Sequence, residues 1–339
     1  MKQVGVLCGI AAVAFSGYRL QAGVSATDPG YSCYAFESGS VESGADSAST
    51  RTSANLHREV RIQGDEFTMG TDTGYYEERP ARQVTVTDFW IDVHEVTNRQ
   101  FAAFVQATSY VTTAEREPDP ALFPEIPAEL LVPGSATFVK PGDRPKGQER
   151  HWWKFVNGAS WHQPHGPGSS IDGLENYPVV HISYEDANAY ATWAGRTIPS
   201  EAQWELAAQA SAKLQKANTW QGYFPMQDSA LDGFHGIAPV GCYQADESGL
   251  FDMKGNVWEL VSDHFEIGGA TGDGLNANPE IVMVNSTMAA SSLRPMRVIK
   301  GGSYLCSDNF CQRDRPQSRQ GQEEDFSTDH VGFRTISLH

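Results

Sequence analysis

Residues 297–311 read RVIKGGSYLCSDNFC, a short apolar run followed by two glycines and two cysteines. Gly301 and Gly302 give the backbone conformational freedom just before Cys306, and Cys311 follows five positions later. A stretch of this kind can bring two sulfur atoms to one small centre. The spacing does not by itself say what that centre does.

Three roles are open to Cys306 and Cys311. In an exported protein a local disulfide is the ordinary outcome, and the spacing alone favours it. A zinc site is less well matched, because such sites usually have two residues between the cysteines and a second ligand pair, which this sequence lacks. Two soft thiolates are also preferred ligands of Cu(I), which makes a copper site the third option.

The N-terminus has the pattern of an export signal. Lys2 precedes an apolar stretch over residues 4–15, and the small residues of 24–26 then provide the spacing that a signal peptidase requires. The apolar stretch is shorter than the roughly 18–20 residues that span a bilayer. We therefore predict a signal peptide over residues 1–26 and a periplasmic or secreted protein without a membrane span.

Signal cleavage changes the cysteine count. The sequence has five cysteines, and Cys8 would be removed with the signal. Four cysteines can pair in three ways, and one possibility is a structural bridge between Cys33 and Cys242, separate from the pair at 306 and 311.

Composition limits the class of protein. The chain has 339 residues, of which 40% are hydrophobic, which is enough for a folded core. Its net charge of 25 − 42 = −17 argues against nucleic-acid binding, because an acidic surface repels phosphates. Residues 27–56 are rich in Ser and Gly and predict a disordered linker, so the folded domain is expected over residues 57–339.

Hydrophobic periodicity predicts a mixture of strands and helices. Alternating residues indicate strands near 60–62, 67–70, 84–87 and 89–91. Capping signatures predict three helices, which begin at Thr97, Ser183 and Ser200. The long stretches 142–178 and 218–250 are dense in Gly, Pro and aromatic residues and have no clear period. Together these patterns predict a single α+β domain that is rich in loops and low in regular secondary structure.

Several motifs in this order resemble the formylglycine-generating enzymes, also called sulfatase-modifying factors. They run from about residue 60 to residue 336, nearly the whole chain after the linker. The motifs are Phe67–Gly70, Trp90–Asp92 with Glu95–Thr97, Trp152–Trp153 with Gly158–Trp161, Tyr177–Ser183, Trp193–Arg196, Pro199–Glu205, Gly255–Glu259, Arg297–Cys306 with Cys311, and Val331–Arg334.

The resemblance implies a formylglycine-generating-enzyme fold of C-type-lectin-like architecture and an O2-dependent oxidase. Such enzymes convert a cysteine within a Cys-x-Pro-x-Arg segment of a sulfatase to Cα-formylglycine, so the implied partner is an unfolded or nascent sulfatase polypeptide. Cys306 and Cys311 would hold Cu(I) as a bis-thiolate, and the chain would act as a monomer. Ser303 would hydrogen-bond bound oxygen or water, although its position after two glycines equally suits a turn.

The resemblance also implies two structural calcium sites built from oxygen ligands. The first would use Asn218, the carbonyl of Thr219, Asp232 and the carbonyl of Phe234. The second would use Asp252, the carbonyls of Gly255 and Val257, and Glu259. The alternative for both sets is a pair of turns without metal.

Four arginines near the C-terminus are prominent in so acidic a chain: Arg313, Arg315, Arg319 and Arg334. Sequence proximity suggests ion pairs with Asp314, Glu323 or Asp325. The resemblance instead implies that arginines in this stretch support the core around the active site.

Trp152, Trp153 and Trp161 either line a groove for an extended peptide or fill the core.

Ser307 and Phe310 stand where the family often has histidine and tyrosine. At these two positions this chain departs from the family pattern, and the differences bear on proton transfer and on the fit of the substrate.

Two rival functions remain at this stage. One is an oxidase of the same fold that acts on a different thiol or peptide. The other is a non-catalytic binding module in which Cys306 and Cys311 form an ordinary disulfide.

Overall fold

Four short strands follow His57 in the computed structural model of the chain. The structure describes residues 33, 57–124, 126–143, 152–266 and 294–338. The predicted signal peptide lies outside these residues, and so does the predicted linker apart from Cys33. Cys33–His339 forms one compact unit, to which the description below refers.

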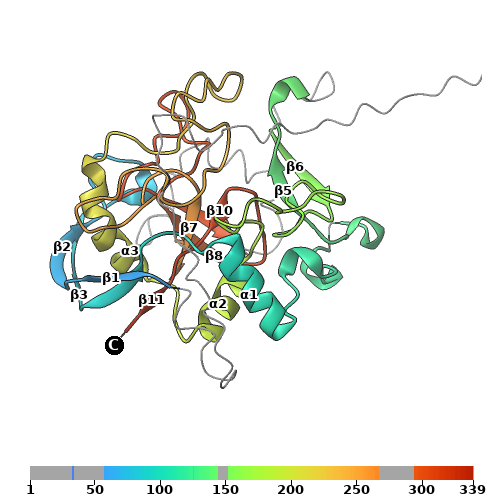
Figure 1. The fold of residues 1–339 in the computed structure, drawn as a ribbon, viewed down its shortest axis with the longest axis horizontal. Coiled ribbons are helices and arrows are strands. Elements are labelled where there is room, and N and C mark those ends of the chain that lie inside the picture. Colours follow the sequence, from blue (N-terminus) through green and yellow to red (C-terminus); the bar gives the residue numbers. More distant parts are fainter. Residues whose placement is uncertain (1–32, 34–56, 125, 144–151, 267–293, 339) are drawn as a thin grey trace, which may run out of the picture. The chain divides into compact units, whose positions relative to one another are not determined.

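The first four strands confirm the alternating patterns that predicted them. They are β1 (Glu59–Ile62), β2 (Asp65–Met69), β3 (Arg82–Val86) and β4 (Phe89–Asp92). β2 and β3 form an antiparallel hairpin, and β4 lies between β1 and the C-terminal strand β11 (Ile336–Ser337). The two ends of the folded domain therefore meet in one small sheet (Figure 1).

The three helices begin at the predicted capping residues. They are α1 (Asn98–Thr108), α2 (Tyr184–Trp193) and α3 (Glu201–Ala208). In each one the N-cap hydroxyl accepts a hydrogen bond from the backbone N–H three residues later, which satisfies a donor left free at a helix start. Within the described residues, short 3₁₀ helices add further turns: η1 (Tyr76–Glu78), η2 (Thr113–Glu115), η3 (Pro120–Leu122), η4 (Ala128–Leu130), η5 (Pro141–Asp143) and η6 (Gln209–Lys213).

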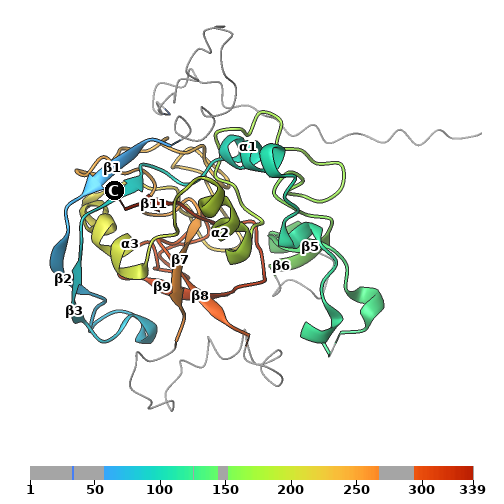
Figure 2. The same cartoon turned by 90° about the horizontal axis from the view of Figure 1, so that it is seen from below.

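A four-stranded sheet at the centre positions the cysteine pair. Its strand order is β10 (Val331–Gly332), β7 (Trp258–His264), β8 (Met296–Lys300) and β9 (Arg319–Glu323). β8 leads directly into the glycine turn before Cys306, and β9 returns shortly after Cys311. In Figures 1 and 2 this sheet lies between the β2–β3 hairpin and a second hairpin, β5 (Gly134–Phe138) with β6 (Trp153–Asn157).

The two long stretches without a clear period differ in secondary structure. Residues 218–250 contain neither helix nor strand, as predicted, whereas 142–178 contains β6. The domain is thus the predicted loop-rich α+β structure, with one hairpin that periodicity did not reveal.

Two hydrophobic clusters form most of the core. One is built around α1 and α2 with Phe333 and includes Cys306, and the other joins the first strands to Trp204 of α3. Cys33 and Cys242 form a disulfide, which confirms that pairing among the three possible ones. Within the described ranges, the helices are too short or too polar to cross a membrane.

Candidate active site

The turn after β8 brings Cys306 and Cys311 together. Gly301 and Gly302 both have positive φ, and a Cβ on Gly302 would lie 2.9 Å from the carbonyl oxygen of Arg313. Ser307 and Cys311 then pair through their backbones, with N···O distances of 3.0 and 3.1 Å. The two sulfur atoms lie 3.0 Å apart and both cysteines are free thiols, so the local disulfide that the spacing favoured is not what the structure shows.

The two thiols have different environments. Cys306 is 1% exposed, and burial raises its pKa well above the ordinary value. Cys311 is half-buried. Its hydrogen bond with Cys306 and the positive charge of Arg313 lower its pKa to about 7. Of the two thiols, Cys311 is therefore the one that ionises more readily.

Ser303 lies against the buried thiol. Its backbone N–H is 3.5 Å from the sulfur of Cys306, and its hydroxyl accepts a hydrogen bond from the N–H of Leu305. The structure therefore shows the turn-forming role, while the contact with Cys306 comes from the main chain.

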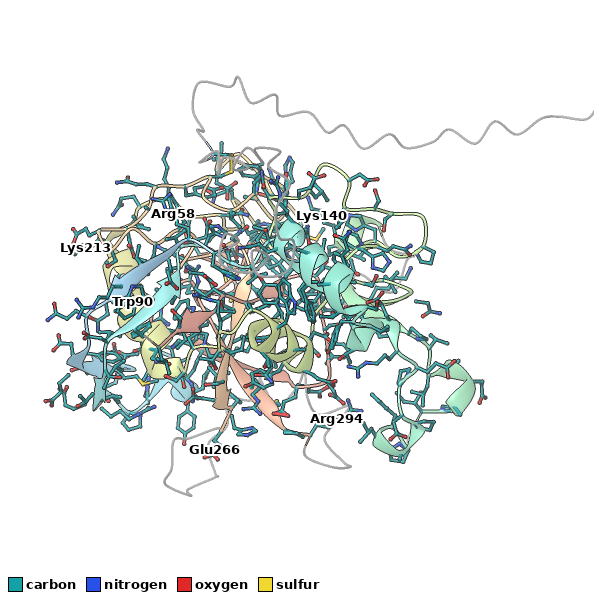
Figure 3. The ribbon with its side chains drawn as sticks, turned by 60° about the horizontal axis from the view of Figure 1, so that its bottom comes forward. Arg58, Trp90, Lys140, Lys213, Glu266 and Arg294 are labelled. Carbon is teal, nitrogen blue, oxygen red and sulfur yellow. A yellow bond between two sulfur atoms is a disulfide. The ribbon has the colours of Figure 1, made fainter. Side chains whose placement is uncertain are left out.

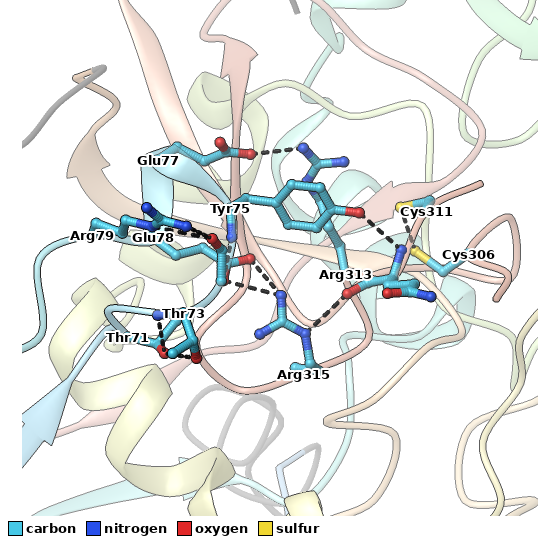
Figure 4. Close-up of polar contacts among 12 residues, drawn as sticks. Thr71, Thr73, Tyr75, Glu77, Glu78, Arg79, Cys306, Cys311, Arg313 and Arg315 are labelled. Atoms are coloured by element: carbon cyan, nitrogen blue, oxygen red, sulfur yellow. Dashed lines mark hydrogen bonds and ion pairs between the residues drawn. The ribbon is translucent and has the colours of Figure 1, made fainter. Parts of the chain in front are cut away.

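The arginines pair with distant carboxylates, so the prediction of local ion pairs is wrong. Each of the four contacts a glutamate that is at most 3% exposed. The pairs are Arg313 with Glu77, Arg315 with Glu78, Arg319 with Glu201, and Arg334 with Glu259. The first two join the segment after β2 to the segment after Cys311 (Figure 4). Arg319 and Arg334 instead contact α3 and β7, through Glu201 and Glu259.

Two aromatic rings contact Phe310, the neighbour of Cys311 in the sequence. Phe310 is 51% exposed, stacks on Phe224 with ring centroids 4.5 Å apart, and contacts the edge of Trp152. Trp161 is a buried core residue, and Trp153 is half-buried against His330. Trp152 therefore contacts the neighbour of Cys311, while Trp161 belongs to the same core cluster as Cys306.

The first predicted calcium set is brought together by the loop 218–234. Asp232 accepts hydrogen bonds from the backbone N–H groups of Thr219 (3.0 Å) and Phe234 (3.3 Å). Asn218 donates its amide to Gly236 and to Asn256. Burial raises the pKa of Asp232, as expected for a carboxylate placed in a closed loop.

The second predicted set lies beside the first. Gly255 pairs with Asn218, and a Cβ at Gly255 would lie 2.2 Å from the Asn218 carbonyl oxygen, so only glycine fits. Val257 follows within the buried segment before β7, while Asp252 accepts a hydrogen bond from Gly241 at 2.7 Å. Glu259 accepts two hydrogen bonds from Arg334, both at 2.7 Å, and one from Trp204 at 2.8 Å.

Sequence reasoning missed Glu95, which lies next to the second set. Its side chain is fully buried, one carboxylate oxygen accepts from Asn256, and the other has no hydrogen-bond partner among the described residues. Burial and the nearby Asp252 raise its pKa well above the ordinary value. Its sequence signal was its place in the motif Glu95–Thr97, which did not indicate a buried carboxylate.

The acids near Arg334 outnumber their buried basic partner. Glu95, Asp252 and Glu259 share one buried arginine, and such a cluster suits a cation. Among the described residues, however, no group of three or more His, Cys, Asp or Glu side chains converges as a ready-made metal site. A cation here would depend on carbonyl oxygens, as the predicted sets do.

Asp329 is a buried carboxylate that contacts the β5–β6 hairpin. One oxygen accepts from the N–H of Phe138 at 2.8 Å, and burial raises its pKa to about 7. The folded state therefore holds this proton to a higher pH than the unfolded chain does, so the contribution to stability is present at low pH and is lost as pH rises through 7.

We expect Asp329→Asn to remove this pH dependence. Between pH 5 and pH 8 the wild type should lose about 2 kcal/mol through Asp329, and the variant should not. Urea denaturation at both pH values measures the difference. Equal losses in wild type and variant would show that Asp329 is ionised throughout.

Comparison with known proteins gives the family of this chain. A sequence model of the sulfatase-modifying factor enzyme 1-like domain matches residues 44–338. The formylglycine-generating enzyme of Mycobacterium tuberculosis is 39% identical over 82% of this chain and 97% of its own length. The enzyme of Mus musculus is 36% identical over 84% of this chain and 76% of its own.

Two further comparisons concern a relative named inactive and a solved structure. A protein named inactive C-alpha-formylglycine-generating enzyme 2, from Mus musculus, is 35% identical over 82% of this chain and 85% of its own length. The structure of PvdO from Pseudomonas aeruginosa superposes with a TM-score of 0.50 at 22% identity, over 82% of this chain and 93% of that one, and supports the fold alone. The match of the domain model and the identity to the curated enzymes place this chain in the family of sulfatase-modifying factors, the formylglycine-generating enzymes.

Proposed function

We propose that this protein is a copper-dependent oxidase that converts a cysteine in a Cys-x-Pro-x-Arg segment of a sulfatase to Cα-formylglycine. The observation that carries the proposal is the pair of free thiols 3.0 Å apart at the end of β8. Family membership alone does not carry it, since a relative named inactive is about as similar as the enzymes.

The two thiols fit a Cu(I) site because thiolates are its preferred ligands and both sulfurs lie on one turn. When bound, copper would supply the single-electron chemistry that lets O2 react with a closed-shell thiol. Cys306 and Cys311 would hold the ion, and the N–H of Ser303 would orient the sulfur of Cys306.

Different residues of the chain would admit the substrate thiol, exclude water and contact the substrate side chains. Cys311 is half-buried, so it lies where an incoming thiol reaches the pair, whereas Cys306 is enclosed in the core. Burial excludes water from Cys306 and protects a reactive sulfur from side reactions. Phe310 and Trp152 flank Cys311 with apolar surface, which suits the side chains next to a substrate cysteine.

The experiment uses two peptides. One contains Cys-x-Pro-x-Arg. The other has the same composition, but its proline and arginine are moved to other positions. The mature protein, copper and O2 should convert the first peptide to the aldehyde, as seen by mass spectrometry, and leave the scrambled one unchanged. Equal conversion of both would favour an oxidase of another thiol, and conversion of neither would favour a binding module.

We also propose that the protein binds calcium through the two sets at Asn218, Thr219, Asp232 and Phe234, and at Asp252, Gly255, Val257 and Glu259. The shared pairing of Asn218 with Gly255 and the unpartnered oxygen of Glu95 support this proposal.

Calcium is expected to stabilise the fold. A ligand that binds only the folded state at 100 times its Kd adds about 2.7 kcal/mol to the free energy of unfolding. Thermal unfolding with calcium and with a chelator measures the gain, and magnesium at equal concentration serves as the control. Asp232→Asn should lose part of the gain, and superimposable curves with and without calcium would contradict both sites.

We propose that the protein is exported, with cleavage of the signal peptide, to the periplasm or the extracellular space. There it acts as a monomer on unfolded or nascent sulfatase chains. The disulfide between Cys33 and Cys242 supports this, because such bonds persist in oxidising compartments.

A further inference from the structure

Asn309 lies in the cysteine turn, between Cys306 and Cys311, and its side chain reaches the loop that contains Phe224. The side-chain oxygen of Asn309 accepts from the backbone N–H of Phe224 at 3.1 Å, and its side-chain nitrogen donates to the carbonyl of Phe224 at 3.4 Å. One amide thus pairs with both polar main-chain groups of Phe224, as a neighbouring strand would. These two hydrogen bonds fix a residue that lies 85 positions earlier in the sequence.

Phe224 is held on its other sides by an aromatic cluster. It is 4% exposed, and its ring contacts those of Trp220 and Trp152 with centroid distances of 5.1 and 5.6 Å. Trp220 of the same loop donates its backbone N–H to the carbonyl of Cys306 at 2.8 Å. The loop is therefore joined to the cysteine turn at two points, through Trp220 with Cys306 and through Phe224 with Asn309.

Phe310, the residue after Asn309, is the exposed ring of this arrangement. It is 51% exposed, yet its ring stacks on that of Phe224 with centroids 4.5 Å apart and planes inclined by 15°. The ring of Trp152 meets it edge-on at 5.4 Å. An exposed aromatic side chain that is already held in one orientation loses little conformational entropy when a ligand binds to it. Phe310 is thus prepared for contact with an apolar group.

Position along the chain indicates which group that is. Phe310 directly precedes Cys311, and consecutive Cα atoms lie about 3.8 Å apart. A peptide whose cysteine reaches the thiols therefore brings the residues next to that cysteine to the ring of Phe310. An apolar side chain at those peptide positions would cover the ring and exclude water from it.

We propose that Asn309 is a positioning residue for the substrate peptide: by binding both main-chain groups of Phe224, it holds the ring of Phe310 as a fixed apolar contact for the residues beside the substrate cysteine. The inference rests on the proposed function in taking a peptide cysteine as the group that meets the thiols. The turn itself does not depend on Asn309, because Ser307 and Cys311 pair through their own backbones.

The test measures peptide binding without chemistry. A fluorescent peptide carries Ser-x-Pro-x-Arg in place of Cys-x-Pro-x-Arg, with leucine on both sides of the serine, and a second peptide has glycine at those two positions. Each is titrated with the reduced, copper-free mature protein, and fluorescence anisotropy gives the Kd. The wild type should bind the leucine peptide more tightly than the glycine peptide.

In Asn309→Ala we expect the Kd of the leucine peptide to rise roughly threefold to tenfold, the range for one side chain that must be ordered on binding. The Kd of the glycine peptide should stay the same, which a general loosening of the fold would not produce. An unchanged Kd for the leucine peptide overturns the proposal. A wild type that binds neither peptide, or binds both equally, overturns it as well.

Gln312→Ala is the matched control. Gln312 is also exposed, lies in the same turn, and donates its side-chain amide to a main-chain carbonyl, that of Asp308, at 2.9 Å. Its loss removes a comparable hydrogen bond but leaves the contact with Phe224 intact, so both Kd values should match the wild type. A rise equal to that in Asn309→Ala would show that any weakening of the turn has this effect, and would overturn the specific role.

A double-mutant cycle tests whether Asn309 acts through Phe310. Phe310→Ala alone should weaken the leucine peptide at least as much as Asn309→Ala does, and adding Asn309→Ala to it should cause no further loss. Additive losses, or no loss in Phe310→Ala, would overturn the positioning role. Both residues are exposed, so these variants should fold, and circular dichroism verifies this.

The binding measurement also separates this inference from the proposed function. It uses neither copper nor O2, so it does not depend on turnover. A protein that binds the peptides as expected but does not oxidise the cysteine peptide would contradict the oxidase and support the role of Asn309.

Discussion

Cys306→Ser and Cys311→Ser are each expected to abolish peptide oxidation, with a loss on the order of 10³-fold or more, since neither residue can act alone. The sulfurs lie 3.0 Å apart, so each would supply one ligand to the same copper ion. A serine oxygen is a hard ligand that does not replace a soft thiolate.

The fold should survive both substitutions. Cys311 is half-buried, so its replacement costs little, whereas a hydroxyl at the buried position 306 costs about 1–3 kcal/mol. Circular dichroism and denaturation verify the fold beside the peptide assay. Ser307→Ala, in the same turn, is the matched control and should retain activity. Wild-type turnover by either cysteine variant would contradict the two-thiolate site.

Arg334→Met is expected to lower the free energy of unfolding by about 3–5 kcal/mol, because it leaves a buried carboxylate without its partner. Arg334 is 0% exposed, forms two hydrogen bonds with Glu259, and donates to the carbonyl groups of Asp92 and Phe251. Its loss would leave Glu259 buried without a counter-charge, beside two further buried acids, Glu95 and Asp252.

Urea denaturation measures the effect, and Lys213→Met is the control. Lys213 extends from the edge of the domain (Figure 3) and pairs with Glu247 in an exposed ion pair, which contributes little. Calcium should recover part of the loss in Arg334→Met if the acids bind it. A loss no larger than that of the control would show that the arginine is not the counter-charge of this cluster.

Local signals explain which parts of the fold could be predicted. The N-caps Thr97, Ser183 and Ser200 satisfy donors within three residues, so their sequences alone indicate helix starts. β9 reads RQGQE, and its position depends on pairing with β8 and on Arg319 reaching Glu201. No period in such a strand distinguishes it from a loop.

In the site, too, local contacts could be predicted from the sequence and long-range contacts could not. The glycine turn and the cysteine spacing predicted that Cys306 and Cys311 meet, and the structure has them in contact. The spacing could not decide between a disulfide and two thiols. The partners of the arginines are 75 to 237 residues away, which is why Glu77 and Glu78 had no signal in their own neighbourhood. Long-range charge pairing is decided by the fold, and local sequence does not encode it.

In the proposed function, this dithiol uses copper and O2 to oxidise a peptide cysteine. The most direct measurement follows the mass of a Cys-x-Pro-x-Arg peptide with the mature protein under four conditions, with and without Cu(I) and with and without O2. We expect aldehyde only when both are present. Absence of aldehyde with copper and O2, or equal amounts without copper, would contradict the claim.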